Sequence, residues 1–286
     1  MSGGYTARRS MVKGKVMRGF NILVLAALMC LPTATSAQER DRLDRRGEVL
    51  GWEGVGRLDT SIGTCTGTLI ARDMVLTAAH CVVDEASRTV LPNDRMRFHA
   101  GLTHDFTAAV RGVTRIVLSD GYLESFDASL TEQVRTDLAL LRLDSPIFST
   151  EAEPFRIHDR AMDSGSVILV SYGRGRNTSL QRESGCRHKQ TYRGGLMTFD
   201  CDVTFGSSGA PVFVNDQGRL RIVSVVSMMS TAPNAEKEAI GMSLPASVSA
   251  MMRDMRNDAA RAPVTAGARR VTVGERAGGA RFIKVD

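Results

Sequence analysis

Short runs of apolar and β-branched residues, separated by turn-forming residues, make up most of the chain between residues 50 and 230. Val, Ile, Leu and Thr dominate the runs, and Gly, Asp, Asn and Ser lie between them. Many short strands with turn signals between them are typical of an all-β barrel or sandwich. The pattern predicts strands at Thr66–Ile70, Met74–Ala78, Met96–Ala100, Val113–Leu118, Leu138–Leu143, Val167–Tyr172, Pro211–Val214 and Leu220–Val226.

The periodicity changes to that of a helix near the C-terminal end. Apolar residues recur there at helical spacing, at Val248, Met251, Met252 and Met255. Pro245 stands where a first helical turn accepts proline, so we predict one amphipathic helix over Leu244–Met255, with its methionines in the core. Beyond Pro263 the chain is rich in Gly, Ala and Arg, and we expect little order there apart from a strand at Arg281–Val285.

The first 37 residues have the organisation of a secretory signal peptide. Five basic residues and no acidic residue precede an apolar run at Ile22–Leu31, and the small residues Thr35–Ala37 suit cleavage. The run is about half the length that a membrane-spanning helix needs. Met29 stands where a lipoprotein signal has a small residue before its cysteine, which argues against lipidation of Cys30. We therefore expect a secreted or periplasmic protein with no stable membrane anchor after cleavage.

The leader also carries most of the net charge of the chain. It holds five of the 37 basic residues and none of the 31 acidic ones, so the remainder has a net charge of about +1. The remaining arginines are scattered, so we expect no nucleic-acid partner. The charged segment Gln38–Arg46 has almost nothing to bury and predicts a linker or short propeptide.

Four cysteines remain once Cys30 is removed, an even number in a chain bound for an oxidising compartment. Two disulfides are therefore expected. Four cysteines allow three pairings, and proximity in the sequence favours Cys65 with Cys81 and Cys186 with Cys201. On the chain-entropy model, closing a loop of about 15 residues contributes roughly 3 kcal/mol.

Three separate segments each hold one residue that a serine hydrolase requires. His80 follows an apolar strand that ends in a small-residue turn, and Asp137 leads into another apolar strand. Ser208 lies in a turn whose glycines let the backbone bend tightly and bring amide groups close to a reacting carbonyl. Taken singly, each feature has a commoner structural explanation, namely a surface histidine, a turn-forming aspartate and a Gly-Ser loop.

Together the three segments resemble the signature motifs of chymotrypsin-like (trypsin-like) serine proteases. The resemblance rests on three motifs in the order His, Asp, Ser: Thr77-Ala78-Ala79-His80-Cys81, Asp137-Leu138-Ala139-Leu140-Leu141 and Gly206-Ser207-Ser208-Gly209-Ala210-Pro211. An α/β-hydrolase has the order Ser, Asp, His and needs glycine where this chain has Ala210. The resemblance spans roughly residues 50–255, and Cys201–Gly209 looks most like the bacterial secreted branch near the glutamyl endopeptidases.

The resemblance implies an all-β fold of two packed, six-stranded antiparallel β-barrels with a C-terminal α-helix. The barrels would cover about residues 47–149 and 150–241, and the helix about 244–256. The protease domain would then be residues 47–258, followed by a Gly/Ala/Arg-rich tail at 259–286. The cleft between the barrels would be the active site.

The resemblance also implies the catalytic roles of a serine-type endopeptidase. Ser208 would attack the scissile carbonyl after His80 takes its proton, and Asp137 would hold His80 in the right tautomer. The amides of Gly206 and Ser208 would form the oxyanion hole. We expect a monomer that acts on a protein or peptide substrate.

The residue before the nucleophile departs from the digestive and clotting relatives. Those proteins have an aspartate that pairs with a newly freed N-terminus, whereas this chain has Ser207. Activation by an N-terminal salt bridge is therefore not expected. If Gln38–Arg46 is a propeptide, its removal would act through another contact.

The residues that set specificity are predicted less sharply. Asp202 lies six residues before Ser208, where trypsin-like relatives attract Lys or Arg, but relatives with this Cys-Asp pair keep the aspartate without that preference. Both a basic P1 preference and a structural role stay open. The substrate-binding segment is predicted to be Ser224–Ser227, with Ser224, Val225 and Val226 as its binding residues. It lacks the histidine of the glutamyl endopeptidases, and Val226 favours a small or apolar P1 residue.

No cofactor or metal is implied, because the five histidines show none of the spacings of a zinc site. The alternative function is a catalytically silent binding protein on a protease fold. That alternative predicts damage to at least one of the three catalytic positions, and none is damaged. An esterase or lipase is disfavoured by the order of the three residues.

Overall fold

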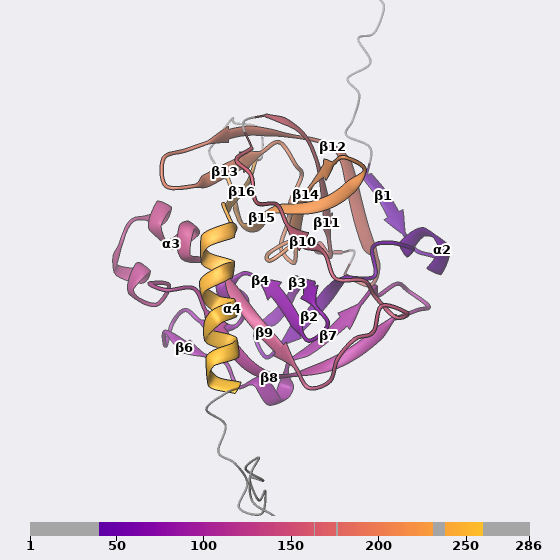
Figure 1. Cartoon of the computed structure of the whole chain (residues 1–286), viewed down its shortest axis with the longest axis horizontal. Coiled ribbons are helices and arrows are strands. Elements are labelled where there is room, and N and C mark those ends of the chain that lie inside the picture. The colour runs from indigo at the N-terminus through magenta and orange to yellow at the C-terminus, as the bar shows by residue number, and fades with distance from the viewer. Residues whose placement is uncertain (1–39, 163, 176, 231–237, 260–286) are drawn as a thin grey trace, which may run out of the picture. The chain divides into compact units, whose positions relative to one another are not determined.

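The computed structural model describes residues 40–162, 164–175, 177–230 and 238–259. The predicted signal peptide, the tail beyond residue 259 and the strand at Arg281–Val285 lie outside these residues. The described strands form two closed six-stranded antiparallel barrels, one purple to magenta and the other brown to orange in Figure 1. This confirms the predicted fold class.

The first barrel closes in the order β2-β3-β4-β9-β8-β7. Its strands are β2 (Val55–Thr60), β3 (Gly63–Ala71), β4 (Met74–Thr77), β7 (Arg97–Ala100), β8 (Ala109–Leu118) and β9 (Ala139–Leu143). Inward-pointing side chains such as Leu69, Phe98 and Leu141 form its core. A small hairpin, β5 (Val83–Asp84) with β6 (Thr89–Val90), follows the turn that carries His80.

The second barrel closes in the order β12-β11-β14-β15-β16-β13, because β12 and β13 also pair with each other. Its strands are β11 (Gly165–Ser171), β12 (Leu180–Thr191), β13 (Leu196–Phe199), β14 (Pro211–Asp216), β15 (Arg219–Met229) and β16 (Ala239–Met242). A short strand, β10 (Arg156–Ile157), pairs in parallel with β15. The eight strands predicted between residues 66 and 226 are all present, with ends that differ by a few residues.

The segment predicted as a linker or propeptide takes part in the fold. Strand β1 (Arg40–Leu43) pairs antiparallel with β12, with Leu43 opposite Leu180. Leu43 is buried in the core, and Asp41 forms an ion pair with Arg182. The short helix α2 (Arg46–Val49) then leads into the first barrel.

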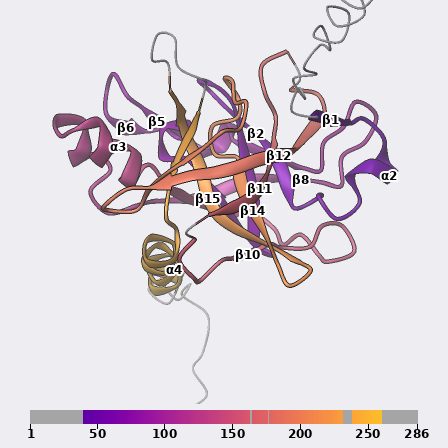
Figure 2. The ribbon, with the colours of Figure 1, turned by 90° about the horizontal axis from the view of Figure 1, so that it is seen from above.

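The two longer helices lie on the same side of the barrels in both ribbon views (Figures 1 and 2). Helix α4 (Pro245–Ala259) begins at the predicted proline, and α3 (Leu130–Thr136) is capped by the Ser129 side chain. Of the four apolar positions predicted for α4, three are buried and Met252 is partly buried. Helix α4 packs against β8 and β9. None of the described helices is long and apolar enough to cross a membrane.

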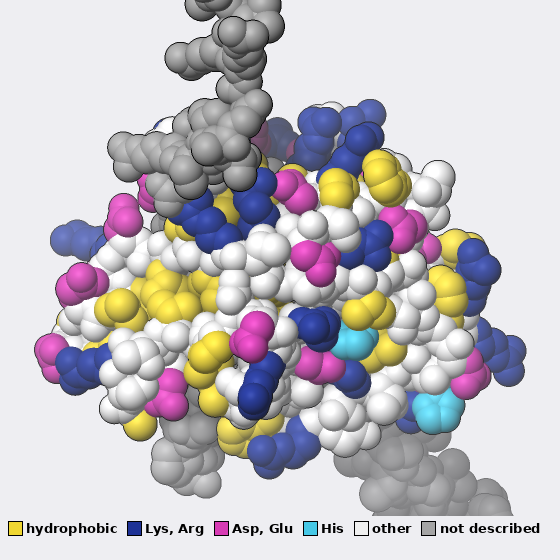
Figure 3. Space-filling view, turned by 90° about the horizontal axis from the view of Figure 1, so that it is seen from below, with side chains coloured by type: hydrophobic (Ala, Val, Ile, Leu, Met, Phe, Trp, Pro, Cys, Tyr) yellow, Lys and Arg dark blue, Asp and Glu magenta, His cyan; other side chains and the backbone are white. Residues whose placement is uncertain are grey.

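Both disulfides favoured by the sequence are present, joining Cys65 to Cys81 and Cys186 to Cys201. The first bond links β3 to the turn after β4, and the second links β12 to the segment after β13. On the face shown in Figure 3, basic and acidic side chains are interspersed, so that face carries no field of a single sign.

Candidate active site

The pairing of β4 with β9 brings His80 and Asp137 together. Thr77 lies opposite Ala139 in this antiparallel pair. His80 comes three residues after Thr77, and Asp137 comes two residues before Ala139, so both lie beyond the same end of the pair. The His80 Nδ1 atom is 2.7 Å from Asp137 Oδ2, and the His80 backbone N–H donates to Asp137 Oδ1 at 2.9 Å.

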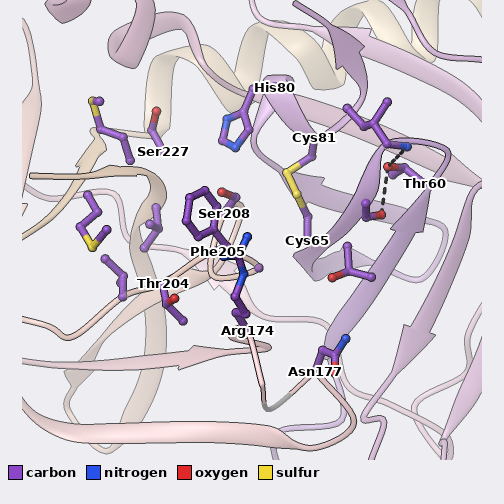
Figure 4. A pocket seen from close by; sticks show the side chains of 18 of the residues that line it. Thr60, Cys65, His80, Cys81, Arg174, Asn177, Thr204, Phe205, Ser208 and Ser227 are labelled. Atoms are coloured by element: carbon purple, nitrogen blue, oxygen red, sulfur yellow. Dashed lines mark hydrogen bonds between the residues drawn. A yellow bond between two sulfur atoms is a disulfide. The ribbon is translucent and has the colours of Figure 1, made fainter. Parts of the chain in front are cut away.

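The Asp137 carboxylate is buried, and both of its oxygens accept hydrogen bonds. Its side chain is 5% exposed, and the Ser227 hydroxyl also donates to Oδ2. Ser227 belongs to the predicted substrate-binding segment, but the sequence analysis did not predict its contact with Asp137. The Cys65–Cys81 disulfide lies beside His80 and holds the turn that carries it (Figure 4). These contacts hold the imidazole ring in one orientation.

The surroundings of His80 raise its pKa above the ordinary histidine value. Burial of the imidazole disfavours its charged form, but the negative charge and hydrogen bond of Asp137 outweigh that effect, and the Glu85 carboxylate adds to it. A histidine with a raised pKa binds a proton more readily when a neighbouring hydroxyl releases one. This environment therefore suits a general base.

Ser208 lies in the turn that leads into β14, next to the His80 ring (Figure 4). Two glycines allow this turn, with φ of +91° at Gly206 and +78° at Gly209. A Cβ atom on Gly206 would lie 2.3 Å from the Tyr172 carbonyl oxygen, and one on Gly209 would lie 2.2 Å from the Thr66 carbonyl oxygen. Only glycine fits these positions, since both the dihedral angles and the close backbone approach exclude a side chain.

Two amide groups of the same turn are free to bind a negatively charged oxygen. Within the described part of the chain, neither the Gly206 nor the Ser208 backbone N–H donates a hydrogen bond. The Phe205 carbonyl accepts from the Arg174 backbone N–H at 2.6 Å, which fixes the peptide unit that also carries the Gly206 N–H. Paired amides of this kind stabilise the oxyanion that forms in acyl transfer.

A cavity of about 670 Å³ opens in front of His80 and Ser208. Its apolar lining consists of Ile62, Val203, Phe205, Val226, Met228 and Met229. No carboxylate belongs to the described residues that line it, and the Arg174 guanidinium lies over the Phe205 ring at 4.1 Å (Figure 4). The cavity therefore presents an apolar wall beside the predicted nucleophile.

Most of the residues predicted to set specificity do not line the large cavity. Asp202 is exposed and does not line the large cavity. It borders a separate small cavity, and its backbone N–H donates to the Glu183 carboxylate at 3.2 Å. Ser224 and Val225 are fully buried in the sheet, where the Ser224 hydroxyl donates to the Met242 carbonyl. Of the predicted segment Ser224–Ser227, Val226 and Ser227 line the large cavity.

Ser207 is held inside the second barrel by neutral hydrogen bonds. Its hydroxyl lies 3.2 Å from the Ser171 hydroxyl and accepts from the Thr204 backbone N–H at 3.3 Å. Ser207 is 2% exposed, so it anchors the turn from behind. The Ser207 hydroxyl makes these contacts as a neutral group, whereas the digestive and clotting relatives have a charged aspartate at this position.

One group of three candidate metal ligands occurs among the described residues, namely Cys65, His80 and Cys81. Both sulfur atoms are bonded to each other in the disulfide, so neither is a thiolate that could bind a metal. The three residues therefore lie together because the disulfide joins β3 to the turn that carries His80.

Comparisons with known proteins agree with this geometry. Residues 65–221 match the trypsin-like peptidase domain family. The chain is similar to serine protease SP24D of Anopheles gambiae, with 27% identity over 172 residues, which covers 54% of this chain and 59% of the relative. It is also similar to a modular serine protease of Drosophila melanogaster, with 36% identity over 88 residues, 29% of this chain and 13% of the relative. The chain thus spans less than two thirds of the length of either curated relative.

Two solved structures show the same fold. One is a Glu endopeptidase in complex with MPD, with a TM-score of 0.62 and 19% identity, covering 78% of this chain and 98% of the other. The second is the thermostable serine protease AL20 from an extremophilic microorganism, with a TM-score of 0.58 and 17% identity, covering 72% and 97%. Because the family match covers more than half of its length, the chain belongs to the trypsin-like peptidase domain family.

Proposed function

We propose that this protein is an exported serine endopeptidase that cleaves peptide bonds through an acyl-enzyme on Ser208. The observation that carries the proposal is the Asp137–His80 hydrogen bond, with Ser208 and two unengaged amides in the same cavity. Family membership supplies the coarser reaction class. The roles of the individual residues are our inference from this geometry.

The reaction begins when His80 Nε2 takes the proton of the Ser208 hydroxyl as Oγ attacks the scissile carbonyl carbon. The new C–O bond makes a tetrahedral oxyanion, which the amides of Gly206 and Ser208 stabilise. His80 then gives its proton to the leaving amine, and the C–N bond breaks to form the acyl-enzyme. Water, activated by His80 in the same way, attacks the ester and releases Ser208.

Asp137 supports both proton transfers without being protonated itself. Its Oδ2 accepts from His80 Nδ1, which leaves Nε2 unprotonated and available to Ser208. When His80 becomes charged, the adjacent carboxylate stabilises the imidazolium. Ser227 holds the carboxylate in place through its hydroxyl.

The substrate backbone is proposed to add to the edge of β15. Strand β14 pairs with β15 only as far as Val225, and the Val226 backbone bonds to Gly209 and Ala210. Beyond Val226, the edge that faces the cavity carries no strand among the described residues, so Ser227–Met229 can pair with an extended peptide. The apolar lining favours a small or apolar P1 side chain.

Export supplies the conditions that the two disulfides need. Disulfides form and persist in oxidising compartments, so we infer a periplasmic or secreted location, reached through the leader at residues 1–37. We also infer that the protein acts as a monomer. Size-exclusion chromatography with light scattering tests the oligomeric state.

The experiment that tests the proposal is labelling with a fluorophosphonate probe. The full chain is exported into an oxidising compartment, and wild type is compared with Ser208→Ala and with a matched control, Ser61→Ala, whose serine is exposed. We expect labelling of the wild type and the control only. A folded wild-type chain that takes up no probe would instead favour a binding protein on a protease fold. Digestion of a peptide library then measures the P1 preference.

A further inference from the structure

Thr66 of the first barrel contacts the predicted nucleophile loop of the second barrel through two of its polar groups. It lies on β3 and is completely buried. Its backbone N–H donates to the Ser208 carbonyl at 2.8 Å, and its hydroxyl donates to the Gly206 carbonyl at 2.8 Å. Its own carbonyl accepts from the Thr77 hydroxyl at 2.8 Å, which fixes Thr66 within the first barrel.

The direction of each hydrogen bond at the Thr66 hydroxyl is determined by its partners. The Tyr172 backbone N–H can only donate, and it lies 3.0 Å from Oγ1. The Gly206 carbonyl can only accept, so the single hydroxyl hydrogen must point toward it. The hydroxyl therefore links two loops of the second barrel, and no apolar side chain could replace both bonds.

The carbonyls that Thr66 binds belong to the two residues whose amides form the proposed oxyanion hole. Arg174 fixes the carbonyl that precedes the Gly206 amide, and the Thr66 hydroxyl fixes the carbonyl that follows it. Gly206 has a φ of +91°, and glycine has more conformational freedom than any other residue. Fixed carbonyls on both sides of Gly206 are what hold its N–H in one direction.

We propose that the Thr66 hydroxyl is a positioning group for the oxyanion hole, so that a residue of the first barrel determines whether the loop of the second barrel can stabilise the transition state. The inference rests on the proposed protease function. Thr66 does not line the cavity, so it acts through Gly206 and Ser208 rather than on the substrate.

The same strand offers a matched control. Thr68 is two residues away on β3 and is also completely buried, but its hydroxyl has no hydrogen-bond partner among the described residues. Thr66→Val and Thr68→Val make the same chemical change in the same strand and at the same burial. Only the first removes hydrogen bonds to the nucleophile loop.

The test compares wild type, Thr66→Val, Thr66→Ser and Thr68→Val as full chains with both disulfides formed. We measure the fluorophosphonate labelling rate, and kcat and KM on a peptide found by library digestion. Loss of one oxyanion donor lowers turnover by about 10²–10³, so a displaced donor in Thr66→Val should lower labelling and kcat by at least about tenfold, with KM nearly unchanged. Thr66→Ser and Thr68→Val should stay near the wild-type rate.

Two results would overturn the proposal. One is a folded Thr66→Val chain that is labelled as fast as Thr68→Val, and the other is a folded Thr66→Ser chain that loses as much activity as Thr66→Val. If Thr66→Val does not fold, Thr66→Ala removes the same hydroxyl with less bulk. If Thr66→Ala does not fold either, Thr66→Ser alone tests the proposal, because the proposal requires this variant to keep a rate near that of the wild type.

Hydrogen exchange of the peptide that covers residues 204–210 separates this inference from the proposed function. We expect faster exchange there in Thr66→Val than in Thr68→Val, whether or not the protein is a protease. Wild type that takes up no probe would refute the protease function. Equal exchange in the two valine variants would refute the positioning role.

Discussion

Asp137 contacts both the ring and the backbone of His80, through Oδ2 to Nδ1 at 2.7 Å and through Oδ1 from the backbone N–H at 2.9 Å. The carboxylate therefore fixes the rotation of the imidazole and the turn that carries it at the same time. Residues 57 positions apart in the sequence are brought together by one strand pair, β4 with β9.

Replacing Asp137 with asparagine should lower kcat by roughly 10⁴ and leave the fold intact. The amide oxygen can still accept from the His80 backbone, but the amide nitrogen would donate to Nδ1. That donation forces the proton onto Nε2, where it blocks proton transfer from Ser208. Steady-state kinetics on a library-selected peptide measures the loss. Asp94→Asn, an exposed carboxylate of the first barrel, is the control, and a folded Asp137→Asn chain with near-normal kcat would contradict the assignment.

The raised pKa of His80 sets the acid limb of the pH profile. Because the neutral imidazole is the active form, kcat/KM should fall as the pH drops through a midpoint above about 6.5, the ordinary histidine value. The stability contribution has the opposite dependence. It is present below the unfolded-state pKa and is lost as the pH rises through the folded-state pKa.

Glu85 contributes to the raised pKa of His80, so Glu85→Gln should move the acid limb to lower pH. The pH dependence of kcat/KM from pH 5 to 8 measures the shift. Glu124→Gln, a second exposed carboxylate, should leave the midpoint unchanged. A midpoint that stays fixed in Glu85→Gln, or that moves upward, would argue against this electrostatic coupling.

The three proposed catalytic positions could be singled out in the sequence because each is marked by a local motif. His80, Asp137 and Ser208 each follow or precede a short apolar strand, and these predicted strands are present. The order of the motifs then indicates the family, and the fold of that family predicts the two barrels. Around these three residues, the strands expected from the local sequence pattern are therefore the strands that the two-barrel fold requires.

The predicted binding segment, Ser224–Ser227, meets the large cavity only at Val226 and Ser227, because its register depends on a contact that the sequence does not show. In Val223–Met229, two serines lie three residues apart, and either could have faced the site. The structure selects Ser227, since its hydroxyl reaches Asp137, whereas Ser224 bonds to Met242. Four strands of the two barrels, β2, β12, β13 and β16, were not predicted. Polar residues or glycine interrupt the apolar pattern of β2, β12 and β16.

Removing the Cys65–Cys81 bond by a double alanine substitution should lower both stability and activity. The chain-entropy model gives a loss of roughly 3 kcal/mol in the free energy of unfolding. Because Cys81 is next to His80, the labelling rate of Ser208 should fall as well. Urea unfolding and probe labelling measure the two effects. Removing Cys186–Cys201 should destabilise by a similar amount with a smaller effect on labelling, and the reverse ranking would contradict this account.

Asp202 should not set specificity, because it is exposed and lies outside the large cavity. Asp202→Asn should therefore leave the P1 profile of a peptide library unchanged. Met229→Ala should widen the apolar cavity and raise kcat/KM for aromatic over alanine P1 residues by at least about tenfold, the low end of the effect of one methylene group. Loss of cleavage after Lys or Arg in Asp202→Asn would restore the trypsin-like alternative.

Strand β1 gives a direct test of the predicted propeptide. A chain that begins at Gly47 lacks Leu43, and burial of one leucine side chain contributes about 1.5–3 kcal/mol. It also lacks the Asp41–Arg182 ion pair and the pairing with β12. Compared with a chain that begins at Gln38, it should therefore unfold at a lower urea concentration and show no gain in activity. Equal stability together with higher activity would instead identify residues 38–46 as an inhibitory segment that is removed on activation.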